Sequence, residues 1–239
     1  MIDLHAHFLP GVDDGPATLA ESLRLAEKAV ADGVEWTVMT PHVHPRRYPN
    51  RLSGLRPHFE NFRSALVEAG IPLKLSLGGE VRFGEESLEL LAQDELPFLG
   101  ECDGFRVLLL EFPHQNVPVG SLQFAERLLA ARIRPLIAHP ERNKSVMARP
   151  EILVPFLDIG CWLQLTAGSL VGRFGRTAQK TAEFILGNRW AHVLATDAHN
   201  LEHRPPLLSE GRDAAARLVG KLLAHEMVVE RPARILGVQ

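Results

Sequence analysis

The chain has 239 residues, of which 46% are hydrophobic and 23% charged, and 26 basic and 29 acidic side chains give a formal net charge of −3. This apolar fraction excludes a mainly disordered chain, and the charge balance argues against a nucleic-acid binder, which would need a basic face. Two cysteines exclude a disulfide scaffold, whereas eleven histidines beside one tyrosine are unusual.

The length suits either one α/β barrel or two smaller domains. No Pro/Ser-rich linker, charge block or repeat divides the sequence, so we expect residues 1–239 to form a single domain. The sequence begins without a basic region followed by an apolar one, and its apolar runs are only as long as strands. We therefore expect a cytoplasmic protein without membrane insertion.

Short aliphatic runs alternate with amphipathic patterns along the whole chain. The predicted strands are Ile2 to His7, Glu35 to Thr40, Leu73 to Gly78, Arg106 to Glu111, Pro135 to His139, Trp162 to Thr166 and His192 to Thr196. The predicted helices are Thr18 to Asp32, Leu55 to Ala69, Glu85 to Gln93, Val119 to Ala131, Pro150 to Asp158, Ala178 to Leu186 and Leu207 to His225. Seven β-then-α units indicate parallel strands with right-handed crossovers. A closed or nearly closed seven-stranded barrel fits this pattern better than an open sheet.

Ionisable residues follow six of the seven predicted strands. In chain order they are His5 and His7, His42, Glu80, Glu111, His139, and Asp197 with His199. The carboxyl ends of parallel barrel strands converge on one face, where the chemistry of such folds is built. The placement therefore predicts a functional site at that face, and it is the main argument for the barrel.

The residue types at this face are those of a metal centre. His5 and His7 are two positions apart on a strand, so both imidazoles point to one side. Glu111 ends an apolar strand, where a carboxylate is costly unless it is paired or bound to a metal. In the turn that follows the first strand, we interpret Asp13 as a turn residue and add Asp14 to the site.

The candidate ligands are His5, His7, Asp14, His42, Glu80, Glu111, His139, Asp197 and His199. They are more than one tetrahedral or octahedral ion needs, so the sequence predicts two or three ions. Imidazole and carboxylate ligands suit Mn, Fe or Zn, and such clustered ions serve hydrolysis. Arg142 and Arg204 would lie at the same face, and arginine binds phosphate oxygens in bidentate fashion, which indicates a phosphoester substrate.

The remaining histidines have other expected roles. His58 and His225 fall on predicted helices and should be solvated, whereas His192 should be packed against neighbouring residues. His114 and His203 would lie in loops beside the ligands. His44 could join the site or only cap the loop that follows it.

Several strings in this sequence resemble the protein-tyrosine phosphatases found with bacterial capsule and exopolysaccharide genes, a branch of the PHP (polymerase and histidinol phosphatase) superfamily. The match extends from Met1 to about Pro206. The strings that carry it are Met1-Ile-Asp-Leu-His-Ala-His7, Leu9-Pro-Gly-Val-Asp-Asp-Gly-Pro16, Thr40-Pro-His42, Gly79-Glu-Val-Arg82, Leu110-Glu-Phe-Pro113, Ala138-His-Pro-Glu-Arg-Asn143, Leu165-Thr-Ala-Gly-Ser-Leu170 and Thr196-Asp-Ala-His-Asn-Leu201.

This resemblance implies a distorted (β/α)7 TIM-like barrel with three divalent metal ions, usually Mn2+. It also implies that the substrate is the phosphotyrosine-rich tail of a bacterial tyrosine kinase that controls polysaccharide export. By position in the motifs, one ion would be held by His5, His7, Glu80 and Asp197, a second by Glu80, Glu111 and His139, and a third by Asp14, His42 and His199. Arg142 and Arg204 match the arginines that contact phosphate. The loop after His42 departs from the family, which often has a second histidine where this chain has Val43.

The expected mechanism is attack on phosphorus by a metal-activated hydroxide, without a phospho-cysteine intermediate. A cysteine nucleophile would need an arginine six positions later, where this chain has Leu108 after Cys102 and Ala167 after Cys161. His44, His203 or a metal-bound water could protonate the leaving group.

Three other functions are open at this point. One is a histidinol-phosphate phosphatase or another small-molecule phosphoesterase of the same superfamily. Another is a metal-dependent deaminase or nuclease, which often carries a lysine at the end of a middle strand, where this chain has none. The third is a non-catalytic protein that binds a kinase.

Overall fold

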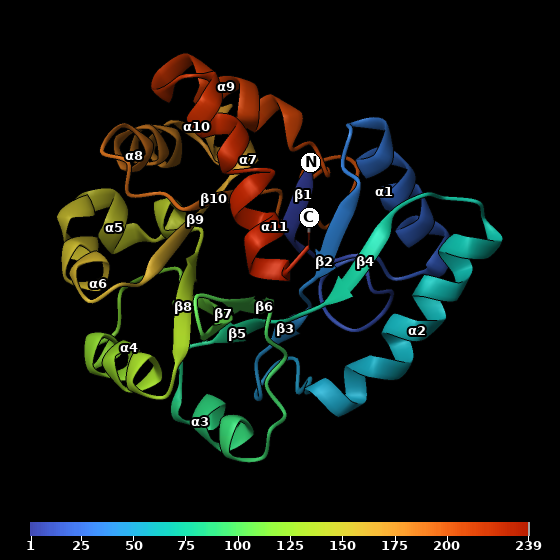
Figure 1. The fold of residues 1–239 in the computed structure, drawn as a ribbon, viewed down its shortest axis with the longest axis horizontal. Helices are drawn as coiled ribbons and strands as arrows, with labels where there is room; N and C mark the ends of the chain where they lie inside the picture. Colours follow the sequence, from blue (N-terminus) through green and yellow to red (C-terminus); the bar gives the residue numbers. More distant parts are fainter. Residues whose placement is uncertain (239) are drawn as a thin grey trace.

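The computed structural model describes residues 1–238, in which strands lie at the centre and most helices surround them (Figure 1). The strands are β1 (Ile2–Ala6), β2 (Trp36–Met39), β3 (His42–Val43), β4 (Lys74–Leu77), β5 (Glu80–Arg82), β6 (Gly100–Cys102), β7 (Phe105–Glu111), β8 (Ile133–Ala138), β9 (Trp162–Thr166) and β10 (Val193–Ala195). Every pairing among them is parallel except that of β6 with β7. The expected parallel α/β architecture is therefore confirmed.

The helices follow the strands in alternation. They are α1 (Leu19–Ala31), α2 (Leu52–Glu68), α3 (Glu85–Ala92), α4 (Ser121–Ala130), α5 (Lys144–Ala148), α6 (Val154–Asp158), α7 (Ala167–Leu170), α8 (Arg176–Gly187), α9 (Ser209–Val219), α10 (Lys221–Glu226) and α11 (Glu230–Leu236), with 3-10 turns at Pro140–Arg142 and Pro150–Leu153. The expected capping box of α1 is present, because Thr18 and Glu21 bond each other's backbone N–H groups. None of the helices in residues 1–238 is long and apolar enough to cross a membrane.

The strands form two ladders that are connected by two short chain segments. One ladder has the order β1-β2-β4, and the other has the order β10-β9-β8-β7-β5-β3. Because β2 and β3 are separated only by Thr40 and Pro41, and β4 and β5 only by two glycines, the ladders continue each other along the chain. A Cβ on Gly79 would lie 2.4 Å from Pro97 Cγ, so this bend needs a glycine.

Backbone hydrogen bonds also join the two remaining ends. The N–H of His7 donates to Ala198 O at 2.9 Å, and the N–H of Asp197 donates to His5 O at 2.8 Å. An isolated parallel bridge pairs Ala6 with Ala198. The first strand thus contacts the chain that follows the last one, and the strands surround a common interior.

Two groups of buried apolar side chains hold this arrangement. The larger group includes Phe8, which follows β1, Leu25 of α1 and Phe62 of α2. The smaller group is the interior cluster, whose buried members are Leu4, Val38, Leu99, Cys102, Val107, Leu109, Leu136, Ala138, Val193 and Ile235. Ile235 belongs to α11, which packs on β1 and β6. A Cβ on Gly100 would lie 2.1 Å from Ile235 O, so this close approach also requires a glycine.

The predicted strands all exist, with ends that differ by one or two residues. Two predicted helices are wrong in their continuity. The segment from Leu207 to His225 breaks at Gly220, which has a φ of 90°, and the segment from Pro150 to Asp158 divides into a 3-10 turn and α6. The predicted start of the second helix at Leu55 is also wrong. That helix begins at Leu52, because Glu95 accepts hydrogen bonds from the N–H groups of Leu52 and Ser53.

Candidate metal centre

Four predicted ligands from three strand segments meet in the interior of the molecule. His5 lies in β1 and His7 directly follows it, Glu80 begins β5, and Asp197 follows β10; all four are buried. The pairing of β1 with β2 shifts register between Asp3 and Ala6, an irregularity that lies directly beside His5. The two imidazoles point to the same side, as predicted, since their Nε2 atoms are 3.1 Å apart.

The spacing of these four groups suits a metal ion. His5 Nε2 lies 3.3 Å from Glu80 Oε2 and 3.2 Å from Asp197 Oδ1, and His7 Nε2 lies 3.4 Å from each of the same oxygens. An ion about 2.1 Å from each of four tetrahedral ligands would separate them by about 3.4 Å. Glu80 Oε2 and Asp197 Oδ1 are buried without a hydrogen-bond partner, which is costly unless a cation is bound there.

The outer nitrogens of three histidines are fixed by acceptors. His5 Nδ1 donates to Gln164 Oε1 at 2.9 Å, His7 Nδ1 to Asp13 Oδ2 at 2.6 Å, and His199 Nδ1 to Asp197 O at 3.0 Å. A histidine that donates from Nδ1 presents the lone pair of Nε2, and such partners typically orient metal-binding imidazoles. Each of these histidines is therefore oriented with its Nε2 toward the other ligand groups.

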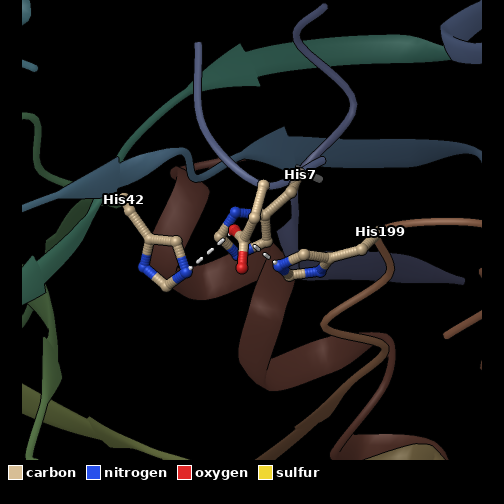
Figure 2. A group of neighbouring side chains, drawn as sticks. His7, His42 and His199 are labelled. Carbon is tan, nitrogen blue, oxygen red and sulfur yellow. Dashed lines mark ion pairs between the residues drawn. The ribbon is translucent and has the colours of Figure 1, made fainter. Parts of the chain in front are cut away.

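A second group lies at the rim of the interior. Figure 2 shows His7, His42 and His199 around a carboxylate, that of Asp14. Asp14 Oδ1 is 3.2 Å from His42 Nε2 and 3.3 Å from His199 Nε2. His199 Nε2 is buried without a hydrogen-bond partner. These residues include the three that were expected to hold the third ion, with His7 added.

Glu80 connects these groups to the remaining ligands. Its Oε1 lies 2.6 Å from His139 Nε2, and its Oε2 lies 3.0 Å from His42 Nδ1. His42, Glu80 and Glu111 have ligand atoms within 4.8 Å of one another, so His42 stands where His139 was expected. Eight of the nine predicted ligands thus belong to groups compact enough to hold a metal ion. The ninth, His139, contacts the carboxylate of Glu80.

The surroundings set the charge of these ligands. Burial opposes ionisation of Asp197, but the positive charges of Arg204, His5 and Arg142 hold its pKa well below the usual range. Burial likewise opposes ionisation of Glu80, and nearby imidazoles lower its pKa. Burial, with the charge of His7, lowers the pKa of His199 to about 4, so it is neutral at pH 7.

His42 behaves differently because it lies between two carboxylates. Burial would lower its pKa, but Glu80 and Asp14 raise it to about 10. The same negative charges that attract a proton to this imidazole would attract a metal cation. A bound ion would therefore compete with protonation at His42.

Two ligands follow their strands in an unusual backbone conformation. His139 has a φ of 34° and Asp197 a φ of 52°, both in the left-handed region that few residues other than glycine adopt. Backbone strain of this kind is concentrated at functional sites, where the surrounding structure holds it in place. At these two residues the left-handed backbone conformation directs the side chain toward the other ligands, directly after the strand ends.

A cavity of about 170 Å3 opens on these groups. Its wall contains both predicted phosphate-binding arginines, and both pair with Asp197 Oδ2. The guanidinium of Arg142 lies 4.3 Å from the ring centroid of Phe174, which adds a second support. The complete lining is Asp14, His42, His44, Arg47, Tyr48, Arg82, Glu111, His114, His139, Arg142 and Arg204.

The other histidines mostly follow the predictions. His58 and His225 are exposed, and His192 stacks on Trp162 with ring centroids 3.7 Å apart. His203 does not line the cavity; its side chain is 85% exposed and lies 3.9 Å from Glu202. His44 does line the cavity. Burial and the positive charge of Arg82 lower its pKa.

The cysteines are buried in the apolar clusters, away from this cavity. Burial raises the pKa of Cys102, and it raises the pKa of Cys161 to about 12. A thiol attacks as its thiolate, so neither cysteine is prepared to act as a nucleophile. This agrees with the absence of a cysteine motif in the sequence.

Two residues beside the ligands were missed by the sequence analysis. The interpretation of Asp13 as a plain turn residue is wrong, because its carboxylate bonds His7 Nδ1 and accepts the N–H of His42 at 3.0 Å. Gln164 lies on β9, the strand that supplies neither an imidazole nor a carboxylate to the site. An uncharged polar residue inside an apolar strand was the one signal for it.

Comparison with known proteins gives consistent results across the chain. The family model described as capsular polysaccharide synthesis, CpsB/CapC, matches residues 1–237. The chain is 33% identical over 204 residues to tyrosine-protein phosphatase YwqE of Bacillus subtilis, covering 85% of this chain and 79% of that protein. It is 32% identical over 210 residues to putative tyrosine-protein phosphatase CapC of Staphylococcus aureus, covering 88% and 81%.

Solved structures show the same relationship. One described as YwqE from Bacillus subtilis and CpsB from Streptococcus pneumoniae, unique metal-dependent tyrosine phosphatases, superposes with a TM-score of 0.92 at 31% identity and covers 100% of this chain and 95% of the other. An organophosphorus hydrolase from Deinococcus radiodurans superposes with a TM-score of 0.60 at 17% identity, covering 99% and 92%, which reflects the fold alone.

Proposed function

Because the chain belongs to the CpsB/CapC family of capsular polysaccharide synthesis, we propose that it is a metal-dependent protein-tyrosine phosphatase. The observation that carries this proposal is the position of two arginines beside the ligand groups, in the wall of one small cavity. A phosphate bound by the arginines would lie next to the metal centre. The relatives and the solved structure named above support the choice of phosphotyrosine.

We propose three divalent ions, with Mn2+ preferred over Fe or Zn. The residues that would hold them are His5, His7, Asp14, His42, Glu80, Glu111, His139, Asp197 and His199. Such ions supply Lewis acidity and a hydroxide nucleophile near neutral pH. The orphaned oxygens of Glu80 and Asp197 support this assignment, since each has a lone pair for a cation.

The protein groups would bind and orient the phosphate. Arg142 and Arg204 both pair with Asp197, which holds the two guanidinium groups side by side. Arginine pairs place several donors on non-bridging oxygens and stabilise the charge that develops in the transition state. Phosphotyrosine releases a phenolate whose conjugate acid has a pKa of about 10, which reduces the need for a strong general acid.

We further propose that the substrate is the phosphotyrosine-rich tail of a tyrosine kinase of polysaccharide export, and that the protein acts in the cytoplasm. The alternative is a small-molecule substrate such as histidinol phosphate. The decisive experiment compares hydrolysis of a phosphotyrosine peptide and of histidinol phosphate by the purified protein with Mn2+. Preference for histidinol phosphate would overturn the proposed substrate.

Variants test the proposed site in the same assay. Asp197→Ala should reduce phosphotyrosine hydrolysis about 100-fold or more, because it removes a ligand and the partner of both arginines. His225→Ala should have wild-type activity, since this side chain is exposed on α10. Thiol alkylation should leave activity intact, and loss of activity on alkylation would contradict the mechanism.

A further inference from the structure

The loop between β3 and α2 carries basic side chains that the proposed chemistry does not use. Its ends are joined by two backbone hydrogen bonds, from His44 N to Tyr48 O at 2.9 Å and from Tyr48 N to His44 O at 2.7 Å. Asn50 Nδ2 donates to Val12 O and to His42 O, at 3.0 and 2.9 Å. The loop backbone is thereby fixed to the turn that carries Asp13 and Asp14, and His44, Arg47 and Tyr48 line the cavity.

Two adjacent arginines of this loop differ in their surroundings. Arg46 does not line the cavity, and its guanidinium pairs with Glu86 at 3.0 Å. Arg47 lines the cavity, and its guanidinium lies 5.0 Å from the ring centroid of Tyr48. Within residues 1–238, no carboxylate oxygen lies within 4.0 Å of the Arg47 guanidinium. Arg47 is thus an exposed positive charge at the cavity wall that is not neutralised by an ion pair.

Two neighbouring side chains of the loop complete this part of the cavity wall. Tyr48 stacks on His42 with ring centroids 5.5 Å apart and an angle of 8° between the planes, which holds the ring that supports Arg47. His44 lines the same cavity, and its Nδ1 is buried without a hydrogen-bond partner. One phosphate would occupy Arg142 and Arg204, which contact Asp197 and not this loop. Arg47 and His44 would then remain available to a second negative group.

We propose that Arg47 and His44 form a second anion subsite, which binds an acidic group adjacent to the phosphotyrosine in the substrate. This inference rests on the proposed function, because it assumes that the phosphotyrosine phosphate occupies the two arginines beside Asp197. The chemistry of the second group is a carboxylate or a phosphate, both of which an arginine binds through paired N–H donors. The subsite would favour acidic peptides over neutral ones and over a lone aryl phosphate.

The test uses one phosphotyrosine peptide in three versions, with glutamine, glutamate or phosphoserine at the positions flanking the phosphotyrosine. We expect the wild-type Mn2+ enzyme to hydrolyse the acidic versions with a kcat/KM about threefold or more above that of the glutamine version at low ionic strength. The two acidic versions compare a carboxylate with a phosphate as the second group. The preference should shrink as salt is added, because screening weakens exposed charge pairs.

Arg47→Gln should reduce the acidic-to-neutral ratio of kcat/KM to about one, because it removes the positive charge that attracts the second anion. Arg46→Gln is the matched control, and it should keep the wild-type ratio. Dissociation constants of the same peptides with a non-hydrolysable phosphonate in place of the phosphate should follow the same order. Equal ratios in wild type and Arg47→Gln, or an equal loss in Arg46→Gln, would overturn the subsite.

The two proposals fail in different ways. Failure of the wild-type enzyme to hydrolyse the glutamine version would contradict the phosphatase function. The affinities for the phosphonate peptides measure the subsite without turnover. An acidic preference in these affinities that Arg47→Gln abolishes would support the subsite, and equal affinities for all three peptides would contradict it.

Discussion

Asp13 lies outside the ligand set but contacts two of the ligands. Its carboxylate accepts hydrogen bonds from His7 Nδ1, from the N–H of His42 and from the N–H of Gly15. The Asp13 carboxylate therefore holds the side chain of His7 and the backbone of His42. Since an anionic partner also makes an imidazole more basic, Asp13 should raise metal affinity as well as order the site.

We expect Asp13→Asn to weaken Mn2+ binding by about 10-fold to 100-fold, because the partner of His7 loses its charge. Calorimetric titration of the metal-free protein measures the affinity. Asp94→Asn is a suitable control, as the Asp94 side chain is 91% exposed. Unchanged affinity in Asp13→Asn would show that Asp13 is only a turn residue.

His192 gives a pH-dependent contribution to stability. Burial, followed by the positive charge of Arg231, lowers its pKa to about 3 in the folded protein, whereas the unfolded chain binds a proton near pH 6.5. Below pH 6.5 the unfolded state therefore binds a proton that the folded state rejects, and stability falls as the pH falls toward 3. Above pH 6.5 neither state binds it, and the contribution vanishes.

His192→Phe should retain the stacking on Trp162 and flatten this part of the pH dependence. Urea unfolding measured at several values from pH 7 to pH 4 provides the slope of the free energy of unfolding. His58→Gln, on the exposed surface of α2, should have the wild-type slope. A slope in His192→Phe as steep as that of wild type would refute the assignment.

At the scale of elements, helix α9 depends on a residue far from it in the sequence. The N-terminal residue of α9 provides no side-chain cap. Asp32, the C-cap residue of α1, supplies the acceptors instead. Asp32 Oδ2 accepts the N–H groups of Leu208 and Ser209 at 2.7 and 2.8 Å, and Oδ1 accepts the Ser209 hydroxyl at 2.6 Å. The first and ninth helices are joined by this contact.

Asp32→Ala should lower the free energy of unfolding by about 1–2 kcal/mol, because it leaves helix N–H groups without acceptors. Asp213→Ala, which removes an exposed partner of Arg212 on the same helix, should cost less than about 1 kcal/mol. Urea denaturation measures both. Similar losses in the two variants would argue against the cap.

The sequence predicted the elements whose pattern is local and missed those set by distant contacts. The strands and the capping box of α1 were predicted because their patterns lie within a few residues. The start of α2 was mispredicted because its acceptor is Glu95. The same holds for the site. The ligands could be predicted because they stand at strand ends, which are visible in the local sequence. The hydrogen bonds of Asp13 with His7 and of Gln164 with His5 could not, because they join residues only in the folded chain.

At the scale of the whole molecule, the ligand groups concentrate negative charge in the interior. Four carboxylates and five imidazoles gather in the interior and at its rim, and Glu80 Oε2, Asp197 Oδ1 and His199 Nε2 are buried there without a hydrogen-bond partner. A cation would supply the missing partner, so metal binding should stabilise the folded state. The stabilisation follows mass action, increasing with the ratio of free metal to its dissociation constant.

Removal of metal by a chelator should therefore lower the midpoint of thermal unfolding and abolish phosphotyrosine hydrolysis, and Mn2+ should restore both. Differential scanning fluorimetry with parallel activity assays makes the comparison. The free energy change should be about 2.7 kcal/mol for metal present at 100 times its dissociation constant. A thermal midpoint insensitive to both chelator and Mn2+ would exclude the proposed ion sites.

The contact between the first strand and the end of the chain has a consequence for biosynthesis. Asp3 bonds Thr196, 193 positions later, and α11 contributes Ile235 to the interior cluster that also contains Leu4. While the chain is being made, β1 can pair early with β2, but its other neighbours, the segment after β10 and helix α11, are made much later. Folds dominated by such distant contacts form slowly, and their incomplete forms expose apolar surface. A metal centre that combines ligands from His5 to His199 should therefore be completed late, after most of these residues have been synthesised.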